Sequence, residues 1–541
     1  MSQQTIVILG GSSSGPTAAA KVREFDEKSR IIIVEKTNKI DFFQSGISYF
    51  FSGEVNSIED FQSERADFFR TAYNIEIKTE TEVVKIDPKK KEIILRGKYE
   101  GTLGYDSLIY ALGAESSVPD KLISKPMNFI SFRTASDLQT IQKYILENKK
   151  KVAIIGAGSF GLEATDGLIR AGLEISLIEK RNNVFPSASQ IASKMIENEI
   201  KSKCKIYKSA EITGFYIENE KIVSIKLKSG DSISVDFVIS AMGVKPNTKL
   251  LSSVGAKVTK EGALILNSSG KTNLPGVYGC GACCAVSHVV YRKKEWMPQA
   301  SISDKLAQIV GANVVGGKFV MNPVTNSLLL RIGNLVYGRA GVIYTPNQKI
   351  ASTIVFAPPI ENFISGAKDI FVQIVWEKKS GVVIGAEIVG ESGVDKRLDT
   401  IVMAISNRTT IQKLSTIDLG YAPPFSPARD PINVAGTVAL YEKKNLVKTI
   451  GSASLAKNLS KYFIVDLSKK NAFASSSIPN STKIPLEELR GRITDIPKNK
   501  PIVTVSETGR RGYLGYRVLV QSGYRDVVNL SGGLRAYNLS L

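Results

Sequence analysis

The stretch KVAIIGAGSFGLEATDGLIRAGLEISLIEK, residues 151–180, decides the fold of this chain. An apolar run leads into Gly156, Gly158 and Gly161 in the spacing G-x-G-x-x-G. A helix-forming segment follows, and a second apolar run ends at Glu179. In a strand–helix–strand unit such glycines allow a tight turn and close approach of phosphate to the helix N-terminus, and the acid accepts from a ribose hydroxyl. The stretch therefore predicts a dinucleotide-binding unit.

The residues around the acid leave the choice of nicotinamide coenzyme open. Glu179 suits the 2′-hydroxyl of NADH. Its neighbours Lys180 and Arg181 could instead meet the additional phosphate of NADPH. NADH and NADPH are therefore both candidates for this unit.

A similar unit begins the chain. TIVILGGSSSGPTAAAKVREF, residues 5–25, is followed by RIIIVEK, residues 30–36, which ends in an acid and a lysine. The middle position of the motif is Ser12, which narrows the approach of the backbone to phosphate, and an ordinary strand-to-helix turn is the alternative. The candidate nucleotide contacts are Gly10, Gly11, Gly15 and Glu35.

Length and composition indicate a multidomain cytoplasmic protein. The chain has 541 residues, of which 43% are hydrophobic, so three or four domains are expected. No apolar run reaches the roughly 18 residues of a membrane span, and the N-terminus shows no signal-peptide pattern. The net charge of +20 is spread without a nucleic-acid motif. We expect neither a membrane nor a nucleic-acid partner.

Further motifs resemble a known family. YDSLIYALGAESSVP (105–119) lies between the two units, and TNLPGVYGCGACCAV (272–286) follows them, as in the FAD-dependent pyridine nucleotide-disulfide oxidoreductases. DLGYAPPFSPARDPINVAG (418–436) resembles the interface signature of their coenzyme A-disulfide reductase, NADH oxidase and persulfide reductase branch. The resemblance implies FAD in the first unit, NADH or NADPH in the second, a homodimer, and a small-molecule acceptor related to coenzyme A. It adds Gly113, Gly281 and Ala282 to the cofactor contacts.

The C-terminal part resembles a rhodanese domain. YFIVDLSKK (462–470) and PIVTVSETGRRG (501–512) give two strands and a loop whose amides could hold an anion or a persulfide. The predicted fold class is therefore α/β, with two Rossmann-like dinucleotide-binding domains, an α+β dimerisation domain and a rhodanese-like α/β domain. The expected limits are 1–115 with 245–320 for FAD, 116–244 for NAD(P), 321–445 for dimerisation and 456–541 for the rhodanese-like domain.

Both cysteines that carry sulfur chemistry in the family are serine in this chain. Ser45, in DFFQSGISYFF (41–51), corresponds to the redox cysteine beside the flavin, and Ser506 to the rhodanese cysteine. A hydroxyl forms no disulfide and ionises far less readily than a thiol. The only histidine, His288, is not obviously placed to act as a base for a serine nucleophile. We expect loss of the thiol–disulfide step and no sulfurtransferase activity.

Other family positions are partly changed. Ala282 replaces the acid that binds the ribityl chain, which could cost about 1–3 kcal/mol of FAD affinity. Ser159 replaces the aromatic gate of the nicotinamide pocket, while Glu163, which helps place the nicotinamide, and Tyr421 of the interface are retained. Phe363 and Ile364 replace a tyrosine pair, and Gly512 follows the retained Arg511 in the rhodanese loop. The coenzyme A contacts implied are Thr17, Lys21, Gln44 and Arg429, although Glu24 and Asp41 stand where relatives carry arginine and serine.

The remaining cysteines form a C-x-x-C-C-x-x-x-H pattern with His288. Cys280, Cys283 and Cys284 could in principle bind a metal with it, or form a relocated redox pair. Adjacent cysteines normally point apart, and the segment is already assigned to the flavin-binding turn. We therefore expect inert buried thiols and no metal.

Three functional hypotheses remain. The first is an FAD-dependent NAD(P)H oxidoreductase that passes electrons to oxygen or a quinone. The second is a degenerate nucleotide- or coenzyme A-binding scaffold, and the third is an engineered Cys-to-Ser variant of an active reductase. Flavin absorbance of the purified protein separates the first two.

Overall fold

The computed structural model describes residues 3–42, 44–61, 66–119, 122, 126–472 and 478–540. The chain divides into two compact units: residues 1–182 with 203–324, and residues 183–202 with 325–541. No helix in the described ranges has the length and apolar character needed to cross a membrane. The expected cytoplasmic location and the expected domain limits stay predictions.

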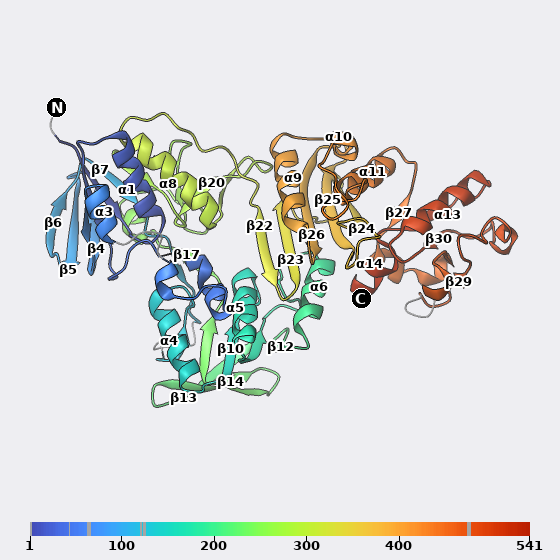
Figure 1. Ribbon diagram of the computed structural model, residues 1–541, viewed down its shortest axis with the longest axis horizontal. Coiled ribbons are helices and arrows are strands. Elements are labelled where there is room, and N and C mark those ends of the chain that lie inside the picture. Colours follow the sequence, from blue (N-terminus) through green and yellow to red (C-terminus); the bar gives the residue numbers. More distant parts are fainter. Residues whose placement is uncertain are drawn as a thin grey trace. The chain divides into compact units, whose positions relative to one another are not determined.

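A parallel five-stranded sheet forms the first half of the first unit, in the order β19-β7-β1-β2-β3. After their first residues its central strands are apolar and buried, as in a parallel sheet covered on both faces. Helix α8 (Ala300–Val314) lies beside α1 (Ser14–Phe25) (Figure 1), because Gly311 brings the α8 backbone against Ala18. The strands are β1 (Thr5–Leu9), β2 (Arg30–Val34), β3 (Ile75–Lys78), β7 (Ser107–Tyr110) and β19 (Val277–Gly279).

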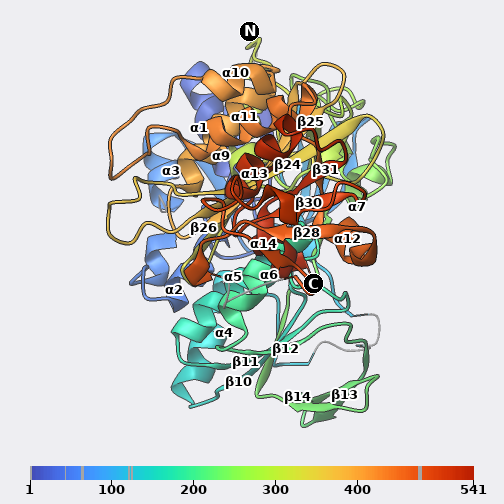
Figure 2. The ribbon, with the colours of Figure 1, turned by 90° about the vertical axis from the view of Figure 1, so that its right-hand side faces the viewer.

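The second sheet repeats this design in the order β12-β11-β10-β16-β9, again parallel. Helices α4 (Ala135–Leu146) and α5 (Ser159–Arg170) lie beside it (Figure 2), and Tyr144 of α4 stacks on Phe237 of the sheet with 5.3 Å between ring centroids. The strands are β9 (Phe129–Ile130), β10 (Lys151–Ile155), β11 (Glu174–Ile178), β12 (Lys205–Tyr207) and β16 (Phe237–Ser240).

Small antiparallel sheets and short helices complete the first unit. The sheets are β4 (Thr81–Asp87), β5 (Glu92–Gly97) and β6 (Gly101–Gly104); β13 (Ile212–Glu218), β14 (Lys221–Leu227) and β15 (Ser232–Ser234); β8 (Ala114–Ser116) and β17 (Val244–Pro246); and β18 (Leu264–Ile265), which pairs parallel with β20 (Cys284–Ser287), beside β21 (Lys294–Trp296). The helices are η1 (Gln44–Gly46), α2 (Ile47–Phe51), η2 (Ile58–Phe61), α3 (Ala66–Ala72) and α7 (Lys249–Ser252).

The second unit begins with an antiparallel sheet in the order β22-β23-β26-β25-β24. Strands β25 and β26 are almost wholly buried, because α9 and α11 pack against the sheet. Its elements are α6 (Gln190–Ile200), β22 (Leu328–Ile332), β23 (Leu335–Gly341), β24 (Ile350–Ala357), β25 (Ile370–Glu377), β26 (Val383–Gly390), α9 (Val394–Ser406), α10 (Ile411–Thr416) and α11 (Pro431–Lys443).

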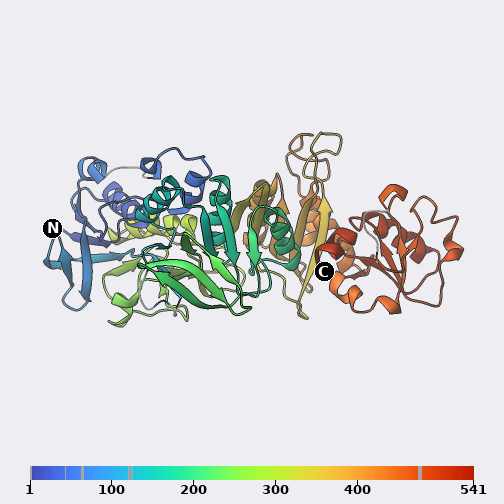
Figure 3. The same ribbon diagram turned by 90° about the horizontal axis from the view of Figure 1, so that it is seen from below.

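A parallel sheet in the order β27-β31-β30-β28-β29 ends the chain, coloured orange to red in Figure 3. Helix α13 packs on one face, and α12 and α14 pack on the other, each over its own apolar core. Its elements are β27 (Thr449–Ile450), α12 (Ser452–Ala456), η3 (Leu459–Lys461), β28 (Phe463–Asp466), η4 (Lys470–Ala472), β29 (Thr482–Lys483), η5 (Ile493–Asp495), β30 (Ile502–Val505), α13 (Arg510–Gln521), β31 (Val527–Leu530) and α14 (Gly533–Ser540).

Candidate functional site

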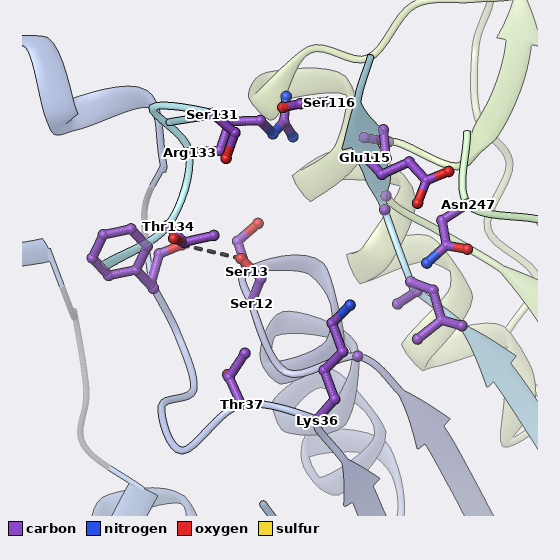
Figure 4. Close-up of a pocket in the computed structure, with 18 of the residues that line it drawn as sticks. Ser12, Ser13, Lys36, Thr37, Glu115, Ser116, Ser131, Arg133, Thr134 and Asn247 are labelled. Carbon is purple, nitrogen blue, oxygen red and sulfur yellow. Dashed lines mark hydrogen bonds between the residues drawn. The ribbon is translucent and has the colours of Figure 1, made fainter. Parts of the chain in front are cut away.

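A cavity of about 1400 Å³ opens in the first unit, where β1 and β2 end and α1 begins (Figure 4). Ligand sites of open α/β sheets occur at this end of the strands. Segments from both sheets of the unit contribute side chains to it. The predicted site residues that line it are Gly10, Glu35, Ser45, Gly113, Glu163, Gly281 and Ala282.

The two glycine loops share one geometry. Gly10 and Gly156 have φ values of +103° and +104°, a conformation that disfavours any side chain. A Cβ on Gly15 would overlap the Gly10 carbonyl oxygen, and a Cβ on Gly161 would overlap that of Gly156. Each loop therefore packs tightly onto its helix, leaving the helix N-terminus free to face an anion.

Gly158 differs, and this gives a prediction. Its φ of −73° suits any residue, and no atom lies within 4 Å of a Cβ placed there. Gly158→Val should keep the free energy of unfolding within about 0.5 kcal/mol but lower NADH affinity at least about tenfold, because its side chain fills the space for phosphate. Gly161→Val should instead destabilise the fold by about 2 kcal/mol or more. Denaturant unfolding and NADH fluorescence titration check both, and unchanged NADH binding by Gly158→Val would contradict the prediction.

Glu35 after β2 and Glu179 after β11 each accept a hydrogen bond from the glycine loop of their own unit. Glu35 accepts hydrogen bonds from the Gly11 amide at 2.7 Å and the Thr37 amide at 2.8 Å. Glu179 makes the corresponding pair of bonds in the second loop. A carboxylate has about four acceptor positions, so each acid keeps capacity for a ribose hydroxyl.

Ser12 joins the first loop to the segment that carries Ser45. Its hydroxyl donates to the Phe42 carbonyl oxygen at 3.1 Å, the dashed line in Figure 4. The Asp41 amide donates to the Gly11 carbonyl oxygen at 2.7 Å. The serine that narrows the phosphate loop therefore also positions the neighbouring segment.

Ser45 lies in η1, is exposed and lines the cavity. Helix α2 behind it is held against α5, because a Cβ on Gly167 would lie only 2.6 Å from the Ser48 carbonyl oxygen. His288 cannot serve it as a base: its Nδ1 accepts from the amides of Val290 at 3.1 Å and Tyr291 at 3.3 Å, and the ring is buried. The side chain of Gln44 lies outside the described residues.

Glu163 lies on α5, one turn after Phe160, and both residues line the cavity. Burial raises the pKa of its carboxyl to about 7. Ser159, the predicted gate position, is not among the described residues that line the cavity, whereas its neighbour Phe160 packs edge-on against Phe132 with 5.7 Å between ring centroids. An aromatic side chain therefore stands at this wall, one position later than the family pattern.

Glu163 should make stability depend on pH. Its folded pKa lies above the unfolded value, so the folded state binds more protons and the free energy of unfolding falls as pH rises from about 4.5 to 7. Between pH 5 and pH 8 the free energy of unfolding of Glu163→Gln should fall by roughly 2–3 kcal/mol less than that of wild type. Denaturant unfolding at pH 5 and pH 8 checks this, with Glu218→Gln, an exposed acid, as the matched charge change. If the free energy of unfolding of Glu163→Gln fell between pH 5 and pH 8 as much as that of wild type, the prediction would be contradicted.

Arg133 is a site residue that the sequence prediction missed. Its side chain extends into the cavity (Figure 4), and burial lowers its pKa. It precedes α4, whose capping box is formed by Thr134 and Asp137, and the Arg133 amide donates to the Asp137 carboxylate at 3.0 Å. A half-buried guanidinium facing a large cavity suits a phosphate. The sequence feature that could have identified Arg133 is an arginine directly before a capping box, between the two nucleotide-binding units.

The cysteine-rich segment packs behind the cavity wall. The Ala282 carbonyl oxygen accepts from Trp296 Nε1 at 2.8 Å, which fixes the turn without an acidic side chain. Cys280, Cys283 and Cys284 are buried, and the last two sulfurs lie 3.7 Å apart. Burial raises the pKa of Cys280 and Cys284, and within the described ranges no cluster of three or more His, Cys, Asp or Glu could hold a metal ion.

Family comparisons agree with this geometry. Residues 4–306 match the pyridine nucleotide-disulphide oxidoreductase family, 347–431 match its dimerisation domain, and 452–540 match the rhodanese-like domain. The chain belongs to the pyridine nucleotide-disulphide oxidoreductases. The predicted fold class is confirmed, and the family implies FAD and NAD(P)H as cofactors.

Relatives of this oxidoreductase cover most of the chain. An NADH oxidase of Methanocaldococcus jannaschii is 30% identical over 452 residues, which is 81% of this chain and 99% of the relative. A coenzyme A disulfide reductase of Staphylococcus haemolyticus is 25% identical over 80% of this chain and 98% of the relative. The structure of reduced Bacillus anthracis CoADR-RHD has a TM-score of 0.95 at 26% identity, covering 100% of this chain and 99% of that one. The NAD-dependent persulfide reductase from A. fulgidus has a TM-score of 0.92 at 27% identity, covering 98% of this chain and 100% of that one.

The oxidoreductase's predicted coenzyme A contacts on α1 already have acidic partners. The Thr17 hydroxyl donates to Asp304 at 3.3 Å, and Lys21 forms a 2.5 Å ion pair with Glu24. Each acid places a carboxylate beside a residue that was predicted to contact coenzyme A. This surface is therefore less suited to coenzyme A than the family pattern implies.

Phe363, Tyr421 and Arg429 lie on exposed loops of the second unit. Two hydrogen bonds of Glu361 join the Phe363 loop to the loop that carries Tyr421 and Arg429. The Glu361 amide donates to the Pro423 carbonyl oxygen, and the Glu361 carboxylate accepts from the Ala428 amide. Tyr421 and Phe363 are 56% and 74% exposed. They are available to a partner.

Ser506 lies at the base of the rhodanese-like loop. It is buried, and its hydroxyl oxygen accepts from the Gly512 amide at 3.0 Å. Arg511 is paired with Glu487 at 2.5 Å and donates to the Leu467 carbonyl oxygen at 2.7 Å. The loop thus keeps its fold with a hydroxyl in place of the sulfur.

Proposed function

We propose that the protein is an FAD-dependent NAD(P)H oxidoreductase that passes electrons to a small acceptor without a thiol–disulfide step. The observation that carries this is Ser45 in the cavity wall, where relatives of this family would use a thiol. FAD, when bound, would supply the hydride acceptor and the electron donor. The name of one relative, the NADH oxidase that is 30% identical to this chain, supports this reaction class.

The residues present fit both cofactors. Gly10 and Glu35 would receive the adenosine end of FAD, and Arg133 its pyrophosphate, because a half-buried cation and the N-terminus of α1 both line the cavity. Gly158 and Glu179 would receive the nicotinamide nucleotide, since the first leaves open space and the second presents a fixed carboxylate. Glu163, protonated in part near neutral pH, would donate a hydrogen bond within the cavity.

Thiol-dependent reactions are disfavoured at this site by its chemistry. Ser45 cannot form a mixed disulfide or a persulfide. Activating its hydroxyl requires a base, and the single histidine has its Nδ1 engaged by backbone amides. The acidic partners of Thr17 and Lys21 weigh against coenzyme A disulfide as the acceptor, and oxygen or a quinone needs neither contact.

The alternative of a nucleotide-binding scaffold is favoured by one observation, the alanine at position 282. Absorbance spectra separate the two functions. Protein purified with FAD should be yellow, with a band near 450 nm that NADH bleaches in the absence of oxygen. Protein that stays colourless after incubation with FAD would overturn the oxidoreductase and favour the scaffold.

We also infer a homodimer, supported by the dimerisation-domain match and by the exposed aromatic side chains of the joined loops. Phe425, 71% exposed, lies in the Tyr421 loop. Phe425→Asp should raise the dissociation constant of the dimer at least about 30-fold, because a desolvated aromatic anchor becomes a charge. Sedimentation velocity checks this, with Phe68→Asp on α3 as the control. A monomeric wild type, or an unchanged dimer in Phe425→Asp, would contradict it.

A further inference from the structure

We propose that Cys283 and Cys284 form a redox-sensitive pair, which a peroxide closes to a reversible disulfide that weakens FAD binding. The inference rests on the proposed function only in that FAD occupies the cavity of the first unit. The sequence predicts that adjacent cysteines point apart and stay inert, whereas the structure places the two sulfurs 3.7 Å apart. The sulfurs are thus in contact before any oxidation.

The two thiols meet because only one of them lies in a strand. The Cys284 amide donates to the Gly281 carbonyl oxygen at 3.1 Å, which closes a turn that contains Cys283. Strand β20 begins at Cys284. Successive side chains point to opposite faces within a strand, and the turn lifts this restriction for Cys283. Gly279 leaves room for the Cys284 sulfur, since a Cβ there would lie 3.1 Å from it.

The two thiols differ in chemistry although both are buried. The hydrogen bond from the Cys284 thiol, followed by bonds from backbone amides that include those of Leu112 and Gly113, lowers the pKa of Cys283. Burial raises the pKa of Cys284. Because the thiolate is the nucleophile of a thiol pair, Cys283 is the attacking sulfur and Cys284 the one that closes the disulfide.

The pair lies directly behind the wall of the cavity. Gly281 and Ala282, the two residues before Cys283, line the cavity, and so do Leu112 and Gly113. Oxygen that accepts two electrons and two protons in this cavity becomes hydrogen peroxide. The oxidant would therefore form on the other side of one layer of backbone from the two sulfurs.

Disulfide formation takes two steps that balance. The Cys283 thiolate attacks a peroxide oxygen, the O–O bond breaks, and a sulfenic acid forms as hydroxide leaves. The Cys284 sulfur then attacks the sulfenic sulfur, so an S–S bond forms, the S–O bond breaks, and a second hydroxide leaves. The protons of the two thiols convert both hydroxides to water. The two sulfurs lose two electrons in total, and the peroxide gains them.

A disulfide between neighbouring residues is strained. Neighbouring Cα atoms lie about 3.8 Å apart, whereas those of bridged cysteines are usually at least about 4.4 Å apart. A strained disulfide is reduced readily, as a reversible switch requires. Closing the ring also shifts the turn that Trp296 Nε1 holds through the Ala282 carbonyl oxygen at 2.8 Å. Because Gly281 and Ala282 line the cavity, this shift should weaken FAD binding.

Peptide mapping of the full-length protein tests the pairing. After treatment with hydrogen peroxide, unfolding and alkylation should count two free thiols in place of the four of the untreated chain. The tryptic peptide 272–292 contains Cys280, Cys283 and Cys284, and only Cys280 in it should be alkylated. Dithiothreitol should restore all four thiols. The Cys280→Ala variant should form the same disulfide, and Cys284→Ala should form none.

Fluorescence titration with FAD tests the effect on the cavity. The dissociation constant for FAD should rise at least about tenfold on oxidation of wild type and return to its first value with dithiothreitol. In Cys284→Ala, peroxide should change this constant by less than about twofold. The oxidised and reduced wild types keep the test decisive if Cys284→Ala does not fold.

The outcomes separate this inference from the proposed function. A disulfide that includes Cys280, four free thiols after peroxide, or an FAD affinity unchanged by the disulfide would overturn the inference. NADH oxidation by the FAD-loaded protein without disulfide formation would overturn the inference alone. Reduced wild type that binds no FAD would overturn the proposed function and the effect on FAD, and the peptide map would still decide whether Cys283 and Cys284 pair.

Discussion

Ser45→Cys is expected to raise NADH-dependent turnover of a disulfide at least about 100-fold above the wild-type rate. Ser45 is exposed and lines the cavity in which we propose that FAD binds. Its segment is held by the Ser12–Phe42 hydrogen bond and by the packing of α2 on α5, so a thiol at this position faces the same cavity. A thiolate can attack a disulfide and form the mixed disulfide that a hydroxyl cannot. NADH consumption under anaerobic conditions measures the gain.

The control for this variant is a cysteine elsewhere on the same cavity wall. Ser116→Cys adds a thiol to β8, which also lines the cavity, and should leave disulfide turnover at the wild-type level. Coenzyme A disulfide and a small disulfide without a nucleotide are both assayed, because the acid partners of Thr17 and Lys21 weaken coenzyme A binding. Ser45→Cys with FAD bound and no gain on either disulfide would show that more than the sulfur has been lost.

Asp430→Asn is expected to lower the free energy of unfolding by about 3–5 kcal/mol, the largest stability effect we predict. Asp430 forms a two-point pair with Arg397, at 2.7 and 3.1 Å, and both side chains are 1–2% exposed. Its carboxylate also accepts from the Ser426 hydroxyl and the Ile432 amide, both at 2.9 Å. The asparagine, directly after the exposed loop of Tyr421 and Arg429, leaves a buried guanidinium without its counter-charge.

An exposed ion pair is the matched comparison for this buried one. Lys368 and Glu391 lie 2.7 Å apart with side chains 65% and 40% exposed. Glu391→Gln should therefore change the free energy of unfolding by less than about 1 kcal/mol. Denaturant unfolding of the three proteins checks the contrast. Equal effects of the two substitutions would contradict the role assigned to burial.

Local motifs predicted the parts of the site whose chemistry is fixed by spacing. The glycines at 10, 15, 156 and 161 could be predicted because the tight turn after each first strand requires them. The acids at 35 and 179 could be predicted because each comes directly after the next strand. Ser45 could be placed because its segment keeps the family pattern. The glycines and the acid of each loop lie within one strand–helix–strand unit, so a short stretch of sequence contains the whole pattern.

Tertiary contacts account for what the sequence did not show. Arg133 enters the cavity from the loop between β9 of the second sheet and α4. Phe160, the neighbour of the predicted Ser159, lines the cavity and packs against Phe132. Asp304, nearly 300 residues along the chain, partners Thr17 because α8 packs on α1. Such neighbours are set by how helices pack, and spacing along the chain carries no record of them.

We propose above all that this oxidoreductase fold works without sulfur chemistry at Ser45. The most direct measurement is the steady-state rate of NADH oxidation by FAD-loaded wild type, with oxygen or a quinone as acceptor, and anaerobically with coenzyme A disulfide. We predict turnover with oxygen or the quinone and a rate at background with the disulfide. Disulfide turnover equal to or faster than that with oxygen and quinone would contradict the account.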